Sequence, residues 1–260
     1  MLVTDHLGRM VEINLPAKRI VSLCPSITET LFALGTGSRV IGRTRFCIHP
    51  DPEVKSVLNV GGTKDVSYSR ISSLHPDLII AEKEENTKEI VAALERDYSV
   101  FVGDVNTVSD TFRLIQDLGK LTDSNESATK LVESIQSGLP RHSMMPVLRY
   151  AYVIWKNPEM GVGKGTYIDD LIIQYGFYNV FSDLPDRYPH FSLPMLMERK
   201  PDVVFLSSEP YPFTESDRAF FATHLPHTVT LLIDGEVAWY GARMAKAMQV
   251  LRDARMAVER

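Results

Sequence analysis

Short runs of β-branched and other apolar residues alternate along the first half of the chain with segments of helical period. The pattern predicts a small β-hairpin over residues 2–15, with Gly8 in its turn. We expect strands at 19–23, 39–42, 77–81 and 100–102, and helices at 27–34, 87–94 and 108–121. Strands and helices that alternate in this way are typical of a mainly parallel sheet covered by helices.

The second half of the chain repeats this order. Residues 74–86 (LHPDLIIAEKEEN) correspond to residues 199–210 (RKPDVVFLSSEP), because each has a helix end, a Pro-Asp pair, a buried strand and a polar loop. Residues 28–42 correspond in the same way to residues 167–183. The repeat is too long for a solenoid, so it predicts two related lobes.

A helical segment separates the two halves. An apolar stripe runs from Ala128 to Leu139, and Asp123 is placed to cap the helix that carries it. The predicted fold class is α/β, with two related lobes of mainly parallel sheets joined by a single long helix. The expected parts are an N-terminal α/β lobe with the leading hairpin (1–122), the connecting helix (123–146) and a C-terminal α/β lobe (147–260).

Composition and charge exclude several classes of protein. Of the 260 residues 44% are hydrophobic and 23% charged, which is ordinary for a folded domain and argues against a disordered chain. The formal net charge of −5 argues against sequence-independent nucleic-acid binding, which requires a basic surface. No apolar stretch approaches the roughly 18 residues that a membrane helix needs, so we expect no membrane insertion.

The first residues of the chain do not form a secretory signal, because charged residues interrupt any apolar region there. The sequence as written therefore predicts a cytoplasmic protein. The protein would be periplasmic or on the cell surface if Met1 replaces a removed signal sequence. Cys24 and Cys47 are too few for a disulfide framework and leave the compartment open.

Ligands of open α/β sheets bind beyond the carboxyl ends of the strands, so the residues that follow each strand are candidates for the site. Both halves combine aromatic rings with cations there, which suits a flat or conjugated ligand with anionic groups. The candidates of the first half are Ser26, Arg43, Arg45, Phe46, Lys83 and Glu85. Those of the second half are Trp155, Lys156, Tyr167, Glu209, Trp239, Tyr240 and Arg243.

Purely structural roles are open for several candidates. Ser26 and Thr166 stand where helices begin and can be helix caps alone. Trp239 and Tyr240 can be core aromatics at the start of the last helix, with Arg243 as their solvent-facing neighbour. The charged cluster at residues 82–85 is the kind of segment that usually forms a solvated loop.

Sequence motifs give no sign of catalysis, and we expect no enzyme. Residues 161–166 (GVGKGT) look like a phosphate loop, but that pattern needs glycine at position 158 and serine or threonine at position 165. The chain has Pro158 and Gly165 there. Cys47 and His49 are metal-ligand types two residues apart. Either they bind a metal together with a distant carboxylate, Glu85 or Glu209, or they are a partly buried thiol and a loop histidine.

Four segments together resemble a known family, the helical-backbone (class III) substrate-binding proteins of ABC importers, which bind cobalamin, ferric siderophores or haem. The segments are RIVSLCPSITETLFALGTGSRVIGRT (19–44), HPDLIIA (75–81), GKGTYIDDLIIQYGFYNVFSDLP (163–185) and KPDVVFLSSEP (200–210). The resemblance implies two lobes joined by one long helix, a shallow ligand cleft between them and small closure on binding. It implies a monomeric carrier for a corrinoid, ferric siderophore, haem or other metal chelate, with an ABC permease as partner and no required cofactor.

The chain departs from the family pattern at several positions. Family members that deliver to a permease carry a surface glutamate on each lobe, and here those positions hold Ser69 and Pro194. Tyr188 matches one aromatic position of the cobalamin binders, whereas Thr63 occupies the place of another. A cytoplasmic chelate-handling enzyme or a ligand sensor on the same fold is the alternative that these departures leave open.

Overall fold

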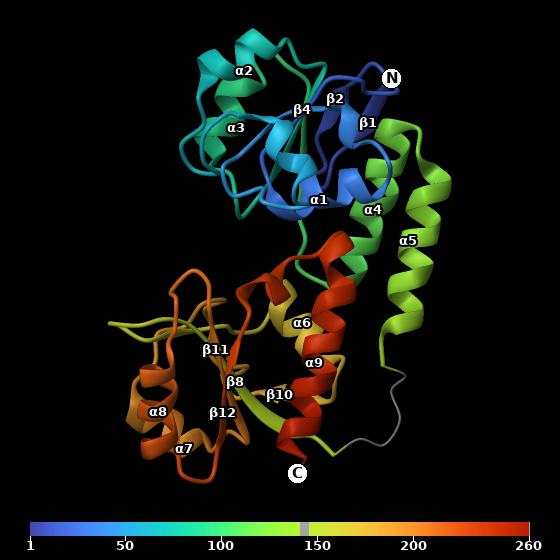
Figure 1. Ribbon diagram of the computed structural model, residues 1–260. Coiled ribbons are helices and arrows are strands. Elements are labelled where there is room, and N and C mark those ends of the chain that lie inside the picture. The colour runs from blue at the N-terminus through green and yellow to red at the C-terminus, as the bar shows by residue number, and fades with distance from the viewer. Residues whose placement is uncertain (141–145, 260) are drawn as a thin grey trace. The chain divides into compact units, whose positions relative to one another are not determined.

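The computed structural model describes residues 1–140 and 146–259, and these form two α/β units (Figure 1). Unit 1 comprises Met1–Val105, Ser109–Gln136 and Gly241–Arg243, and unit 2 comprises Asn106–Val108, Ser137–Tyr240 and Met244–Arg260. The chain therefore passes between the units five times. No helix in the described ranges is long and apolar enough to cross a membrane.

A parallel five-stranded sheet forms the centre of unit 1, in the order β5-β4-β3-β6-β7. Its strands are β3 (Ile20–Ser22), β4 (Val40–Arg43), β5 (Leu58–Asn59), β6 (Leu78–Glu82) and β7 (Val100–Gly103). β3, β6 and β7 are buried along their whole length, as their continuous apolar runs predict for strands covered on both faces. The four strands predicted in this region are confirmed.

Helices cover both faces of this sheet (Figure 1). They are α1 (Pro25–Ala33), η1 (Gly37–Arg39), η2 (Glu53–Ser56), α2 (Tyr68–Leu74), α3 (Lys88–Leu94), α4 (Val108–Thr122) and α5 (Asn125–Gly138). Ile71 of α2 and Ile90 and Leu94 of α3 pack on one face of the sheet, against β3, β6 and β7.

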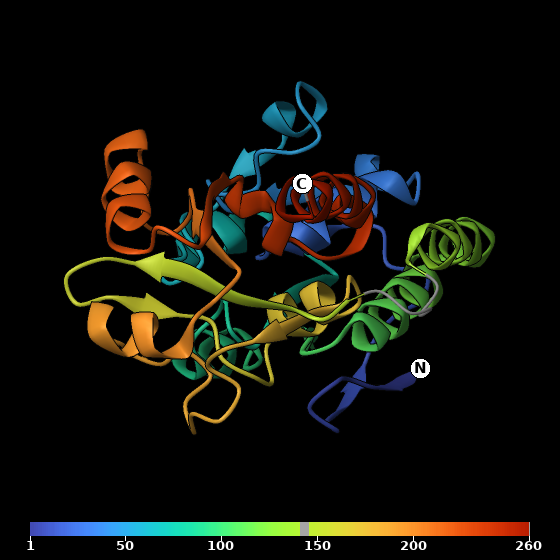
Figure 2. The same ribbon diagram turned by 90° about the horizontal axis from the view of Figure 1, so that it is seen from below.

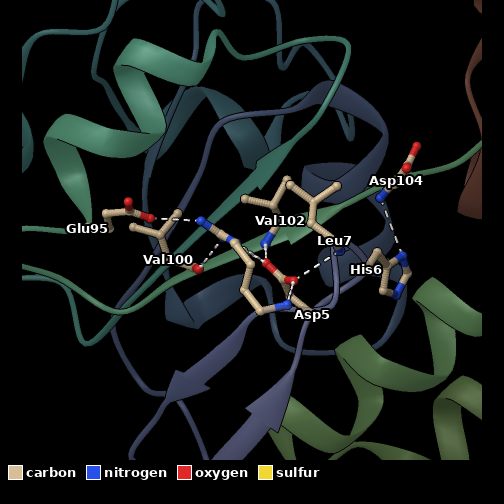
Figure 3. Close-up of polar contacts among 8 residues, drawn as sticks. Asp5, His6, Leu7, Glu95, Val100, Val102 and Asp104 are labelled. Atoms are coloured by element: carbon tan, nitrogen blue, oxygen red, sulfur yellow. Dashed lines mark hydrogen bonds and ion pairs between the residues drawn. The ribbon is translucent and has the colours of Figure 1, made fainter.

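The N-terminal hairpin pairs β1 (Leu2–Thr4) with β2 (Met10–Glu12), as predicted. Its turn is held against the edge strand β7 by Asp5, which is fully buried (Figure 3). The Asp5 carboxylate accepts hydrogen bonds from the backbone N–H groups of Leu7, Arg9 and Val102, and it forms an ion pair with Arg9 at 2.7 Å. The hairpin thus covers part of a strand edge that would otherwise be unpaired.

Unit 2 repeats the topology of unit 1. Its parallel strands are β8 (Leu148–Trp155), β10 (Phe177–Asn179), β11 (Val203–Ser207) and β12 (Val229–Ile233), in the order β10-β8-β11-β12. This order matches β4-β3-β6-β7, and the short β9 (Met160–Gly161) adds an antiparallel strand beside β8. The two related lobes predicted from the repeat are confirmed.

The helices of unit 2 lie on both faces of its sheet, with α6 and α9 on one face and α7 and α8 on the other (Figures 1 and 2). They are α6 (Tyr167–Ile173), α7 (Leu193–Arg199), α8 (Glu215–His224), η3 (Gly235–Ala238) and α9 (Met244–Val258). The short η4 (Gly241–Arg243) between η3 and α9 belongs to unit 1. Leu196 of α7 and Phe221 of α8 belong to one apolar cluster with β8 and β11.

Two differences from the sequence-based expectations concern the ends of helices. Asp123 does not cap α5, because it has a left-handed backbone with φ of 53° and the helix begins at Asn125. The last helix begins at Met244, so Trp239 and Tyr240 lie in the turns before it. Residues 141–145 of the expected connecting helix, and Arg260 of the expected C-terminal lobe, lie outside the described residues.

Candidate functional site

The strand order of unit 1 reverses between β3 and β6, which makes the loops after these two strands the expected place for a ligand. Glu82 ends β6 and is only 2% exposed. Its Oε2 accepts the backbone N–H groups of Glu84 at 2.7 Å and Glu85 at 3.0 Å. Burial raises the pKa of Glu82 to about 7 despite these hydrogen bonds. The cluster at residues 82–85 is therefore not a solvated loop throughout, because its first residue is buried.

Asn86 fixes the same loop from the other side. Its Nδ2 donates to the carbonyl of Thr63 at 2.9 Å and to that of Leu23 at 3.3 Å, which links the loops after β3, β5 and β6. Burial raises the pKa of the half-buried Glu85, while the Lys64 charge and the Thr63 hydroxyl act in the opposite direction. Glu85, one of the predicted ligand contacts, thus lies beside the buried Thr63 at this edge.

Arg45 and Phe46 form an exposed pair after β4. The Arg45 guanidinium lies 5.1 Å from the centre of the Phe46 ring, and the ring is 49% exposed. Arg45 also pairs with Asp65 at 2.9 Å. Arg43 donates instead to the carbonyl groups of Val54 and Thr44, so it fixes the loop. Phe46 is the predicted aromatic residue of unit 1 that offers a free ring surface.

Cys47 is buried, and its Sγ lies 3.1 Å from the Thr28 hydroxyl and 3.2 Å from the Thr44 hydroxyl. Burial raises the pKa of the Cys47 thiol, although these hydroxyl groups lower it. His49 is half-buried on the same loop. Within residues 1–140 and 146–259, no group of three or more His, Cys, Asp or Glu side chains is placed to hold a metal ion.

Ser26 and Arg243 both contribute to the surroundings of α1. Ser26 is the buried second residue of this helix, and its carbonyl accepts the Thr30 hydroxyl. Arg243 belongs to unit 1, although it follows the strands of unit 2 in sequence. Its guanidinium pairs with Glu29 of α1 at 2.8 Å, and its side chain is 10% exposed, so it is not the solvent-facing neighbour expected from the sequence.

The strand order of unit 2 reverses between β8 and β11, and Trp155 stands at the end of β8. Its ring is 41% exposed and meets the Tyr211 ring edge-on, with centroids 5.9 Å apart. Lys156 pairs with Asp217 at 2.5 Å, and Asp217 also caps α8 through Thr214. The Lys156 pair lowers the pKa of Asp217. Trp155 therefore presents an accessible ring at the end of a strand, next to a residue fixed by a salt bridge.

The loop after β11 is fixed by its own serine residues. Ser207 Oγ accepts the Tyr152 hydroxyl and the Glu209 backbone N–H, each at 3.3 Å, and burial raises the pKa of Tyr152 to about 12. Ser208 Oγ accepts the Gly235 N–H at 2.9 Å. A side chain at Gly235 would lie 2.5 Å from the Glu209 Cβ, so glycine is required there to seat Glu209.

The remaining aromatic candidates of unit 2 differ in accessibility. Tyr167 and Tyr240 are buried and meet edge-on, with ring centroids 5.7 Å apart, so they pack as core residues. Trp239 and Tyr188 are half-buried, and Arg187 lies 5.9 Å from the centre of the Tyr188 ring. Thr166 is the N-cap of α6, because its side chain accepts the Asp169 N–H.

Four of the predicted cations have acidic partners that the sequence reading did not identify. Lys83 pairs with Asp104 at 2.7 Å. Together with the pairs described above, the partners are Asp65, Asp104, Asp217 and Glu29. A carboxylate within 4 Å of each cation leaves less net positive charge for an anionic ligand than the sequence indicates. The carboxyl ends of the sheets are thus marked by exposed aromatic rings more than by charge.

Known proteins resemble this chain in sequence and in fold. Residues 20–228 match the periplasmic binding protein family. A vitamin B12-binding protein of Vibrio cholerae is 24% identical over 197 residues, which are 74% of this chain and 71% of that protein. A vitamin B12-binding protein of Vibrio parahaemolyticus is 26% identical over 201 residues, 75% of this chain and 72% of that protein.

A solved structure also has the same fold. The periplasmic haem-binding protein of Pseudomonas aeruginosa superposes with a TM-score of 0.79 at 20% identity, over 92% of each chain. At this identity the superposition establishes the fold.

Proposed function

Because this chain belongs to the periplasmic binding protein family, we propose that it binds a flat metal chelate of the corrinoid or haem type and serves as the binding protein of an ABC importer. The observation that carries this proposal is Trp155, an exposed ring at the point where the strand order of unit 2 reverses. β8 is buried from Tyr150 to Ile154 and ends in this large, 41% exposed aromatic ring.

The chemistry of the carboxyl ends favours stacking over ion pairing. Phe46 in unit 1 and Trp155 in unit 2 each offer a ring beside a cation that already has an acidic partner. Conjugated macrocycles bury a large apolar face against such rings, and their peripheral polar groups can bond to the nearby charged side chains. The relatives that bind vitamin B12 and haem support this class of ligand.

Binding in this proposal involves no covalent step. The hydrogen bonds of Glu82, Asn86 and Ser207 hold the loops at the carboxyl ends before a ligand arrives. Loops fixed in advance lose little conformational entropy on binding, which favours high affinity. A carrier of this kind returns its ligand unchanged, and this property separates it from the alternative of a chelate-handling enzyme.

Equilibrium titration of the full chain tests the site. Cyanocobalamin, haemin and a ferric siderophore are each added while tryptophan fluorescence and visible absorption are followed. We expect at least one of them to bind, and Trp155→Ala to weaken its binding tenfold or more, as for a buried aromatic anchor. The matched control is Tyr178→Ala. Tyr178 is also about half exposed, but it lies opposite Arg149 in the neighbouring strand β8. Arg149 precedes Trp155 by six residues along β8, a distance of roughly 20 Å.

The same samples distinguish a carrier from an enzyme. After incubation, mass spectrometry of the released ligand should show an unchanged mass and the metal still bound. Loss of the metal, or its insertion, by the wild-type protein but not by His49→Ala would instead support the enzyme and a role for the Cys47–His49 loop.

A permease partner follows from the importer proposal. Ser69 and Pro194 are both exposed, and each is the second residue of a seven-residue helix, α2 or α7, that ends before Pro-Asp. Neither carries a charge, so we propose that docking at these helix ends uses neutral contacts. Affinity for the permease should then change little between low and high salt, whereas docking by ion pairs would weaken as salt rises.

A further inference from the structure

A pocket of about 420 Å³ lies in unit 2. One wall is a face of α9 with Gln249, Arg252 and Met256, which are spaced three and four residues apart. The other wall consists of Gly138, Pro140 and Tyr175. The volume falls within the range of small-molecule sites in proteins.

This pocket is at the opposite end of the sheet from Trp155. Tyr175 and Gly176 directly precede β10, and Gly176 accepts the N–H of Leu148, the first residue of β8. Trp155 is the last residue of β8. The length of this strand, roughly 25 Å, separates the pocket from the carboxyl end of the sheet. A ligand here would therefore be distinct from the one proposed above.

Tyr175 lines the pocket and carries an unsatisfied polar group. It is 2% exposed, and its hydroxyl has no hydrogen-bond partner among the described residues. A buried hydroxyl without a partner is unfavourable, and such groups are uncommon in folded proteins. Burial raises the pKa of Tyr175 to about 12, and the Arg252 charge acts in the opposite direction.

Arg252 and Arg255 play different parts around the pocket. Arg255 is 5% exposed; it donates to the carbonyl groups of Tyr175, Gly176 and Pro146 and pairs with Glu259 at 2.8 Å. It therefore forms a fixed frame with its charge balanced. Arg252 donates to the Gly138 carbonyl and to Gln249 Oε1, each at 3.1 Å, and both of these groups are uncharged.

We propose that this pocket binds a medium-chain aliphatic carboxylate, with its head group accepting hydrogen bonds from the Tyr175 hydroxyl and the Arg252 guanidinium and its chain lying against Met256 and Pro140. A carboxylate can accept from both donors at once, and its charge balances that of Arg252. An alcohol would satisfy Tyr175 but leave the arginine charge unbalanced. An amine would place a positive charge beside two arginines.

Calorimetric titration of the full chain with octanoate tests the proposal, with octan-1-ol and octylammonium as ligands of equal chain length. Octanoate should bind saturably with one equivalent per chain, and the other two should bind at least tenfold more weakly. Tyr175→Phe and Arg252→Gln should each weaken octanoate binding about tenfold. Arg218→Gln, which changes an exposed arginine on α8 away from the pocket, should leave it unchanged.

If Arg252→Gln does not fold, Tyr175→Phe still tests the proposal. The hydroxyl that this variant removes has no hydrogen-bond partner among the described residues, so its removal should leave the fold intact. Octanoate should raise the melting temperature of the wild-type protein and should raise that of Tyr175→Phe much less. Absence of saturable octanoate binding would overturn the proposal, as would equal binding of octan-1-ol or unchanged affinity in Tyr175→Phe. Binding of many equivalents without saturation would also overturn it.

Discussion

Asp202 accepts the backbone N–H of Arg149 at 2.6 Å, and the Arg149 guanidinium donates in turn to the carbonyl groups of Arg199 and Lys200. Unit 1 contains the same arrangement. Asp77 accepts the N–H of Arg19 at 3.0 Å, and the Arg19 guanidinium donates to the carbonyl groups of Leu74 and His75. In each unit, one Arg-Asp pair thus ties the start of a central strand to the end of the helix before its neighbour.

Removal of either aspartate should destabilise its own unit. We expect Asp77→Ala and Asp202→Ala to lower the free energy of unfolding by about 1–3 kcal/mol, because each removes a half-buried carboxylate that accepts a backbone N–H at the start of a strand. Both tryptophans lie in unit 2, so tryptophan fluorescence in urea reports Asp202→Ala, and circular dichroism reports Asp77→Ala. Asp51→Ala, which removes only an exposed ion pair with Lys55, should change stability by less than about 0.5 kcal/mol.

Asp5 should be essential for docking of the hairpin (Figure 3). It is fully buried and accepts three backbone N–H groups and the Arg9 side chain. Asp5→Ala should cost about 3 kcal/mol in urea unfolding, since it orphans several donors and one partly exposed charge. Asp5→Asn keeps an acceptor in place and should cost less. Equal stability of Asp5→Ala and the wild type would show that the hairpin does not contribute to unit 1.

The buried Glu82 should make stability depend on pH. Its pKa is raised from 4.5 to about 7, so between these values the folded protein holds a proton that the unfolded chain has released. The free energy of unfolding should therefore fall by up to about 3 kcal/mol as the pH rises from about 5 to about 8. Urea unfolding at both pH values measures this fall.

Two variants isolate the part that Glu82 plays in this pH dependence. Glu82→Gln retains an acceptor for the two N–H groups and should remove most of the fall in stability. Glu84→Gln, in the exposed neighbour on the same loop, should keep it. A fall of the same size in Glu82→Gln would assign the pH dependence to other groups.

Cys47 should be unreactive in the folded protein. Its thiol is buried and its pKa is raised, and Cys24 is also buried, so neither offers an accessible thiolate. Iodoacetamide at pH 8 should label neither cysteine within minutes, and both should be labelled in urea. Rapid labelling of Cys47 alone in the native protein would point to a reactive or metal-binding thiol on this loop.

The fold was largely predictable from the sequence because it rests on local patterns. Apolar runs of strand length identify β3, β6 and β7, and the duplicated Pro-Asp segments identify the equivalent strands of unit 2. The placement of Arg243 in unit 1 was not predictable. It depends on Gly241, whose φ of 76° and close approach to the Thr30 hydroxyl bring this segment onto α1.

The chemistry of the site was less predictable, because it depends on pairs that are distant in the chain. Nothing local to Lys156 indicates that Asp217 will neutralise it, or that Glu82 will be buried while Glu84 is exposed. The sequence placed Phe46 after a strand, as observed, whereas Trp155, expected just after a strand, is the last residue of β8. It could not separate these two rings from the buried Tyr167 and Tyr240, since exposure follows from tertiary packing.

Native mass spectrometry, combined with an absorption spectrum, tests the central claim most directly. The full chain is mixed with equimolar cyanocobalamin, haemin and a ferric siderophore, and the complexes are weighed intact. We predict a one-to-one complex with one of these chelates, a matching visible band, and loss of the complex in Trp155→Ala but not in Tyr178→Ala. A protein that remains free of all three chelates, or a complex that Trp155→Ala leaves unchanged, would contradict the account.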